Sequence, residues 1–194
     1  LKYNRISDIY AWNSQLAKHG ILLTKSRNLF FEKTLNSFKL ILKSIDAINV
    51  FDFLEHIEIS FYQGWDKNKT LLDILNDNLE IDKRRKTTLL GPHKSDIKFF
   101  INNIDAKQIL SRGEQKFFSI LWSCAQNEVL KNEYNIDPIL IIDDIKSELD
   151  ERVFDLLMEI LKHSKNQIIF SCIDHTFSSK MADRLNQFKM FHVE

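Results

Sequence analysis

Apolar residues recur at three- or four-residue steps from about Ser7 to about Ile48, and this spacing predicts a long helical segment. Ser7 and Asp8 are suitable caps for its first turn. Gly20 lies within the pattern and predicts a kink or break, which would turn the segment into a pair of helices. A charged helical pair of this kind is typical of an arm or a bundle element.

The middle of the chain shows shorter elements separated by turn residues. Residues 56–61 alternate between apolar and polar side chains and predict a half-buried strand. The next elements are expected, in order, as a helix from Thr70 to about Lys86, a short strand from Thr87 to Leu90, a turn at Gly91-Pro92, a strand from Ile97 to Ile101 and a turn at Asn102-Asn103.

The rest of the chain alternates between helices and strands. A long helix is expected from Ser111 to about Asn132, and the apolar run from Ile139 to Ile142 predicts a strand covered on both faces. The later elements are expected at residues 151–161 (helix), 168–172 (buried strand), 177–185 (short helix) and 188–193 (final strand). This order predicts an α/β fold with a parallel sheet.

Composition limits the classes of function. The chain has 194 residues, enough for one domain or one and a half, and its formal net charge of zero gives no global field toward nucleic acid or membrane. No apolar run reaches the roughly 18 residues of a membrane span, and no signal peptide is visible. Cys124 and Cys172 lie in apolar segments and are interpreted as reduced core residues of a cytosolic protein.

Two carboxylates, Asp143 and Asp144, follow the apolar run at 139–142. At the carboxyl end of a parallel strand both side chains can reach the crevice where ligands bind. Asp143 is then expected to hold Mg²⁺, and Asp144 to orient or deprotonate the attacking water. The alternative is that the pair only caps the next helix.

A second segment, Ser111 to Gln115, is a polar turn that contains Gly113 and opens a helix. It could place a hydroxyl and backbone amides against a phosphate. The alternative is a capping box, with Ser111 as the cap and Glu114 at its third helical position. The segment from Ser147 to Asp150, taken by itself, is a capping box or a loop.

The order of these segments narrows the choice. A signature turn, a long helix, a hydrophobic strand ending in Asp-Asp and then Ser-x-Leu-Asp is the arrangement of ABC-type ATPase heads. Within that class the chain resembles the RecF family over nearly its whole length. The resemblance is carried by four stretches: Trp12 to Arg27, Thr87 to Asp96, Leu110 to Gln115, and Leu140 to Asp150. The second, with Gly91-Pro92-His93, is the most specific.

The resemblance implies an SMC-like P-loop head with an attached helical lobe. It places the helical arm lobe in residues 1–86 and the C-terminal half of the head in residues 87–194. It implies weak ATP hydrolysis with Mg²⁺, ATP-dependent homodimerisation on double-stranded and gapped DNA, recombinase loading with RecO and RecR, and a role in the SOS response. The residues expected to meet ATP held by the partner subunit are Ser111, Arg112, Gly113, Gln115 and Asp150.

The chain also departs from the family pattern. A phosphate loop of the type Gly-x-x-x-x-Gly-Lys-[Ser/Thr] is absent, because the only glycines are Gly20, Gly64, Gly91 and Gly113. Residue 1 is leucine. The chain is therefore interpreted as the middle and C-terminal portion of such a protein, and alone it is expected not to hydrolyse ATP.

Three further departures concern single residues. Lys94 replaces the arginine usual after Gly-Pro-His, which keeps the charge but loses bidentate geometry. Glu114 stands where a neutral residue is common and would repel a γ-phosphate unless it points away. His175 lies near the position of a switch histidine, but it is also interpreted as a surface residue.

The best local candidate for DNA backbone contact is the basic run Lys83, Arg84, Arg85 and Lys86. The alternative is a solvated helix end whose charges complement the helix dipole. Two other functions stay open: another SMC-like repair ATPase head, or a non-enzymatic DNA-binding or adaptor module with a degenerate head. ATP-dependent dimerisation would separate the last from an ATPase.

Overall fold

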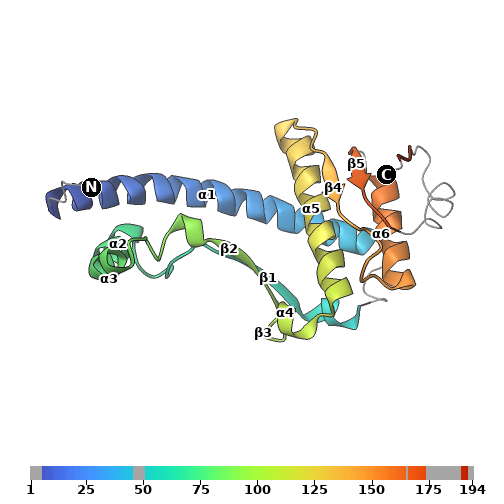
Figure 1. The fold of residues 1–194 in the computed structure, drawn as a ribbon, viewed down its shortest axis with the longest axis horizontal. Helices are drawn as coiled ribbons and strands as arrows, with labels where there is room; N and C mark the ends of the chain where they lie inside the picture. The colour runs from blue at the N-terminus through green and yellow to red at the C-terminus, as the bar shows by residue number, and fades with distance from the viewer. Residues whose placement is uncertain (1–5, 46–50, 165, 174–188, 192–194) are drawn as a thin grey trace. The chain divides into compact units, whose positions relative to one another are not determined.

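The structure is a computed structural model that describes residues 6–45, 51–164, 166–173 and 189–191 (Figure 1). In chain order its elements are α1 (Ile6–Ser44), η2 (Asp52–His56), β1 (Ile57–Tyr62), α2 (Leu71–Asp77), α3 (Leu79–Arg85), η3 (Pro92–Lys94), β2 (Asp96–Ile101), β3 (Ile104–Asp105), α4 (Ala106–Ile109), α5 (Arg112–Tyr134), β4 (Leu140–Ile142), α6 (Glu151–His163) and β5 (Ile168–Phe170).

The chain divides into two compact units, and the division is not a single cut. Unit 1 comprises residues 1–32 and 58–99, and unit 2 comprises residues 33–57 and 100–194. The lobe boundary after residue 86, which rests on the family resemblance, stays a prediction. The predicted elements at 177–185 and 188–193, and His175, lie outside the described residues apart from 189–191.

Helix α1 runs without interruption through Gly20, so the predicted break and pair of helices are wrong. Glycine is needed there for packing in unit 1. A Cβ atom on Gly20 would lie 2.7 Å from Cδ2 of Leu71 and 2.9 Å from Cγ of Pro92. The helix therefore continues through Gly20, and the lack of a side chain at this position lets Leu71 and Pro92 approach the helix backbone.

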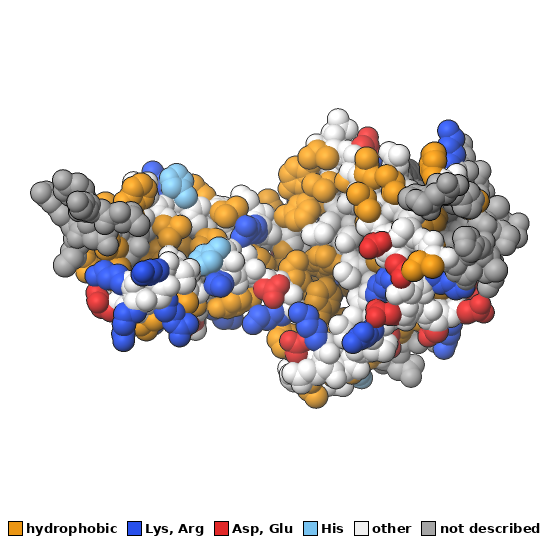
Figure 2. All heavy atoms as spheres, viewed as in Figure 1, with side chains coloured by type: hydrophobic (Ala, Val, Ile, Leu, Met, Phe, Trp, Pro, Cys, Tyr) orange, Lys and Arg blue, Asp and Glu red, His pale blue; other side chains and the backbone are white. Residues whose placement is uncertain are grey.

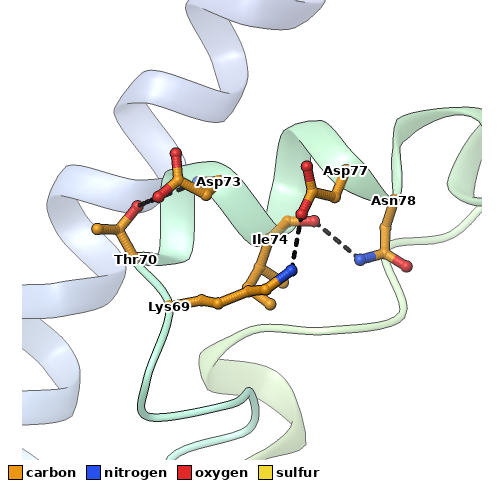
Figure 3. Close-up of polar contacts among 6 residues, drawn as sticks. All are labelled: Lys69, Thr70, Asp73, Ile74, Asp77 and Asn78. Atoms are coloured by element: carbon orange, nitrogen blue, oxygen red, sulfur yellow. Dashed lines mark hydrogen bonds and ion pairs between the residues drawn. The ribbon is translucent and has the colours of Figure 1, made fainter.

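The core of unit 1 consists of Ala17 on α1 together with Trp65, Leu71, Ile74 and Leu75, all buried. Helix α2 is fixed at its ends by local polar contacts (Figure 3). Thr70 caps its first turn by accepting from the Asp73 N–H at 3.2 Å, and Lys69 pairs with Asp77 at 3.1 Å.

The single helix predicted from Thr70 to about Lys86 is instead two helices that meet at Asn78. The Asn78 side-chain amide donates to the carbonyl oxygen of Ile74 at 2.9 Å (Figure 3), which also accepts from the Asn78 N–H at 3.1 Å. Asparagine competes for backbone hydrogen bonds in this way and favours helix ends. Asn78 is thus both the C-cap of α2 and the N-cap of α3.

The predicted strand at Thr87 to Leu90 is also wrong, because these residues form bends and irregular backbone. The Leu89 N–H donates to Oδ1 of Asp82 at 3.1 Å rather than to a neighbouring strand. The predicted turn at Gly91-Pro92 is confirmed, since Pro92 opens the short helix η3. Gly91 has a φ of +140°, which a residue with a side chain rarely adopts.

Strands β1, β2 and β3 form one sheet in that order. The pairing of β2 with β3 is antiparallel, with Ile101 opposite Ile104. Asn102 and Asn103 connect them with φ values of +50° and +65°, as a two-residue hairpin turn requires, which confirms the predicted turn. The pattern did not predict β3 or α4.

Unit 2 contains a parallel pair, β4 and β5, in the register Leu140 to Ile168 and Ile142 to Phe170. Helix α5 confirms the predicted long helix, and α6 confirms the helix predicted to begin at Glu151. Both helices contribute to the core, whose largest fully buried side chains include Phe38, Phe117, Leu121, Ile145 and Leu157. The predicted α/β class is confirmed.

The prediction that β4 is covered on both faces is wrong for this chain. Leu140 and Ile142 are 8% and 4% exposed, whereas Ile141 between them is 72% exposed. Ile169 on β5 is 50% exposed. Within the described residues only one face of this pair is covered.

Among the residues that the structure describes, no helix is both long and apolar enough to cross a membrane.

Candidate nucleotide and metal site

Asp143 and Asp144 lie at the carboxyl end of β4, where the chain leaves the strand as a turn. The hydroxyl of Ser171, which directly follows β5, contacts both residues. It donates to Oδ1 of Asp143 at 2.6 Å and accepts from the N–H of Asp144 at 2.8 Å. Asp144 has a φ of +44°, a left-handed conformation that Asp and Asn tolerate better than most residues.

The backbone on both sides of this corner continues the pairing of β4 with β5. The Ser171 N–H donates to the carbonyl oxygen of Ile142 at 3.1 Å, and the Ile145 N–H donates to the carbonyl oxygen of Ser171 at 3.0 Å. The two carboxylates are therefore carried by backbone that is fixed before and after them.

Lys116, in the second turn of α5, reaches the same corner from the helix side. Its ammonium donates to the carbonyl oxygens of Asp144 at 2.6 Å and Ser147 at 3.0 Å. Sequence reasoning missed both Lys116 and Ser171. Their contacts join residues 27 to 31 positions apart in sequence, so no local motif marks them.

The turn from Ser111 to Gln115 forms the capping box that was one of its two interpretations. Oγ of Ser111 accepts from the Glu114 N–H at 3.3 Å, and Oε2 of Glu114 accepts from the Ser111 N–H at 2.7 Å. Gln115 donates through its side-chain amide to the carbonyl oxygen of Leu110 at 2.9 Å. The carboxylate of Glu114 is thus folded back on the start of its own helix.

Gly113 lies against the backbone of the segment after the acidic corner. A Cβ atom on Gly113 would collide with the carbonyl oxygen of Glu148. Glu148 also pairs with Arg112 at 3.5 Å, with the Arg112 side chain 86% exposed. An exposed pair of this kind adds little stability. The close approach at Gly113 therefore brings the signature turn and the Ser147 to Asp150 segment together.

Asp150 caps α6, and its Oδ1 accepts from the Val153 N–H at 2.8 Å. Its local role is thus that of a helix cap, without the reciprocal contact of a capping box. Asp150 also lines a cavity of about 200 Å³ in unit 2. The other lining residues are Phe51, Ser111, Gly113, Glu114, Glu148, Arg152 and Val153.

This cavity unites three of the predicted nucleotide contacts, Ser111, Gly113 and Asp150, and does not include Asp143 or Asp144. Its lining carries three carboxylates and one guanidinium. Such a lining is not by itself a site for polyphosphate, because carboxylates repel phosphate oxygens. A phosphate would have to arrive with neutralising cations.

The fit to Mg²⁺ depends on Asp143. Among the described residues there is no group of three or more His, Cys, Asp or Glu side chains that could hold a metal. Mg²⁺ in nucleotide sites is commonly bound by one or two carboxylates together with substrate phosphates and water. An exposed carboxylate at a strand end, with a hydroxyl on one of its oxygens, fits that partial ligand set.

The basic run at the end of α3 is exposed at all four positions, and Figure 2 shows Lys and Arg side chains gathered over α2 and α3. Lys83 is paired with Glu80 at 2.7 Å, and this hydrogen bond lowers the pKa of Glu80. Lys86 ends the helix in a left-handed conformation with a φ of +55°. The run therefore has both a helix-ending role and an exposed positive surface.

The Gly-Pro-His segment is held by contacts within unit 1. Arg27 donates to the carbonyl oxygen of Pro92 at 2.6 Å and to the Ser95 hydroxyl at 2.8 Å. Nε2 of His93 lies 2.7 Å from the carbonyl oxygen of Thr88. These contacts hold the turn in place, and the contact of His93 with Thr88 gives the His93 side chain a structural role in it.

Comparison with known proteins points to one family. The chain is 31% identical over 194 residues to the DNA replication and repair protein RecF of Shewanella frigidimarina, covering 99% of this chain and 51% of that protein. It is 33% identical over 193 residues to RecF of Psychromonas ingrahamii, covering 97% of this chain and 50% of that protein. No family model matches the chain.

Solved structures agree on the fold. The structure of the recombination mediator protein RecF with ATPrS superposes with a TM-score of 0.65 at 22% identity, over 90% of this chain and 47% of that one. The structure of RecF-ATP gives a TM-score of 0.61 at 24% identity, over 86% and 45%. The chain spans about half the length of the relatives it matches. By sequence and fold the chain belongs to the RecF family, and it contains no phosphate-loop motif.

Proposed function

We propose that this chain supplies the metal-binding and partner-contacting portions of an ATP-dependent DNA-binding protein that acts in replication and repair. The observation that carries the proposal is the acidic corner, where Asp143 and Asp144 follow β4 and are held by contacts from Ser171, directly after β5, and from Lys116 on α5. Since these residues contain no phosphate-loop motif, the phosphate cradle of the site would come from another part of the complete protein. Family membership supports the DNA repair role.

Asp143 would hold Mg²⁺, directly or through water, and the ion would neutralise charge on the β- and γ-phosphates. Asp144 would accept a proton from the attacking water or orient it. Successive side chains of a strand point to opposite faces. Because the backbone of Asp144 is left-handed, this alternation does not apply to it, and its side chain can lie on the same side as that of Asp143.

Ser111, Arg112, Gly113, Gln115 and Asp150 would form the surface that meets ATP bound to the partner subunit of a homodimer. The start of α5 offers the positive end of a helix dipole, with the Glu114 carboxylate already engaged by the Ser111 N–H. The acidic lining of the nearby cavity would favour a nucleotide whose charge is neutralised by a bound cation such as Mg²⁺.

Lys83, Arg84, Arg85 and Lys86 would contact the DNA backbone. A variant that carries Lys83→Gln, Arg84→Gln, Arg85→Gln and Lys86→Asn tests this role. Asparagine suits the left-handed position 86. The slope of log affinity against log salt should become less steep by about one for each lost phosphate contact. Lys107→Gln with Lys162→Gln, at exposed positions elsewhere, should leave that slope unchanged, and an unchanged slope in the first variant would exclude the contact.

The finer biological role is proposed from the family resemblance: recombinase loading at gapped or single-stranded DNA with RecO and RecR, a part in the SOS response, and a cytoplasmic location. These proposals concern the complete protein. This chain alone is expected to show no Mg²⁺-dependent ATP turnover, because it lacks the amides and the lysine of a phosphate loop. Turnover by the purified chain would contradict that expectation.

The deciding experiment is Asp144→Asn in a full-length protein that contains this chain. Asparagine tolerates the left-handed backbone and removes only the charge. Hydrolysis should slow by about 100-fold or more, while ATP-dependent dimerisation, measured by light scattering, should persist. Unchanged turnover would remove the role assigned to Asp144. Absence of ATP-dependent dimers in the unmutated protein would favour the non-enzymatic adaptor.

A further inference from the structure

The hydroxyl of Ser171 contacts both acids of the corner, and none of the motifs in the chain assigns it a role. It donates to Oδ1 of Asp143 at 2.6 Å and accepts from the N–H of Asp144 at 2.8 Å. Because a backbone N–H can only donate, the hydroxyl must use a lone pair toward Asp144. Its single hydrogen is then directed to the carboxylate of Asp143.

Ser171 is itself fixed by the backbone. Its N–H donates to Ile142 at 3.1 Å, and its carbonyl oxygen accepts from Ile145 at 3.0 Å. The hydroxyl therefore starts from a fixed Cα position next to the end of β4. A donor fixed in this way limits the rotation of the Asp143 carboxylate. Its other oxygen, Oδ2, can then bind a ligand from a restricted set of orientations.

We propose that Ser171 is a positioning residue for Mg²⁺ binding: its hydroxyl orients the Asp143 carboxylate and holds the left-handed backbone of Asp144. This inference rests on the proposed function, since it requires that Asp143 bind the ion. It adds Ser171, which directly follows β5, to a metal site whose only proposed ligand comes from the end of β4. A merely structural Ser171 would affect folding stability and leave metal affinity unchanged.

The test uses Ser171→Ala, Ser171→Thr and the control Ser123→Ala in a full-length protein that contains this chain. Ser123 is a suitable control because its hydroxyl donates only to its own helix, to the Ser119 carbonyl oxygen at 3.0 Å. Mn²⁺ replaces Mg²⁺ as the probe, and its binding in the presence of a non-hydrolysable ATP analogue is followed by electron paramagnetic resonance. Binding of the analogue in EDTA is measured in parallel.

Ser171→Ala should weaken Mn²⁺ binding by about 10-fold or more, as expected when a partner of a metal ligand is removed. Binding of the analogue in EDTA should not change. Ser171→Thr keeps the hydroxyl and should restore most of the affinity, and Ser123→Ala should match the unmutated protein. Equal Mn²⁺ affinity in Ser171→Ala and the unmutated protein would overturn the inference.

The outcomes separate the inference from the proposed function. If the unmutated protein does not bind Mn²⁺ with the analogue, the proposed function fails and the inference fails with it. If it binds and the alanine variant binds equally well, only the inference fails. If Ser171→Ala does not fold, Ser171→Cys has nearly the same size with a weaker donor, and unchanged Mn²⁺ affinity in that variant would overturn the inference.

Discussion

The ammonium of Lys116 lies 2.6 Å from the carbonyl oxygen of Asp144 and donates a hydrogen bond to it. A second hydrogen bond, of 3.0 Å, goes to the carbonyl oxygen of Ser147. Lys116 is one residue after the turn formed by Ser111 to Gln115. The helix that begins at the signature turn therefore also holds the segment that carries the acidic corner.

Replacing Lys116 with methionine should loosen that segment. Methionine keeps the length of the side chain but leaves two partly buried carbonyl oxygens without their charged donor. We expect a loss of about 1–3 kcal/mol in the free energy of unfolding, measured by urea denaturation. Lys107→Met, at an exposed position on α4, is the matched control and should change little. Equal midpoints for both variants would show that these hydrogen bonds contribute nothing.

The local part of the site could be predicted from the sequence, and the long-range part could not. The capping box at Ser111 and the placement of Asp143 at a strand end depend on neighbours within a few residues. Lys116 and Ser171 act through contacts with residues 27 to 31 positions away in sequence. A lone lysine in an amphipathic helix and a serine after an apolar strand are too common to indicate such contacts. Only the fold shows which corner they reach.

Gly113→Ala should destabilise the protein, although alanine normally favours a helix. A helical Gly→Ala change is worth about 0.5–1 kcal/mol in favour of the helix. Here the new Cβ would collide with the carbonyl oxygen of Glu148, which is backbone and cannot rotate away. We expect a net loss of about 1–3 kcal/mol by thermal or urea unfolding, together with weaker ATP-dependent dimerisation in a full-length protein. The exposed Ser119→Ala is the control, and a gain in stability at position 113 would contradict the collision.

Two of the failed predictions for the fold, at Gly20 and at Ile141, concern packing that depends on distant segments. The helix from about Ser111 and the hairpin turn at Asn102-Asn103 follow from local periodicity and turn chemistry. The apolar run at 139–142 predicted a strand, but not that Ile141 would be 72% exposed, because periodicity says nothing about which segments cover a face. The predicted break at Gly20 was wrong for the same reason, because the residues that pack against this glycine, Leu71 and Pro92, are remote in sequence.

Gly20→Ala should lower stability through its contact with Leu71, which is only 1% exposed and has little room to move. The new Cβ would lie 2.7 Å from Cδ2 of Leu71. We expect a net cost of about 1 kcal/mol after the gain in helix propensity. In a double-mutant cycle with Leu71→Ala, the cost of Gly20→Ala should shrink, because the nearest colliding atom is gone and only the contact with Cγ of Pro92 at 2.9 Å remains. Simple additivity of the two changes would contradict this explanation.

Cys124 should be unreactive in the folded protein. Burial in the core raises the pKa of its thiol to about 12 from an ordinary value near 9, with Glu128 adding to the effect. At pH 8 about one thiol in ten thousand would then be ionised, so labelling of a Cys172→Ser variant with a disulfide reagent should require unfolding. Between pH 9 and pH 12 the unfolded chain loses this proton while the folded chain keeps it, so stability should fall as pH rises. Cys124→Ser should show a smaller fall, and rapid labelling at pH 8 without denaturant would contradict the predicted burial.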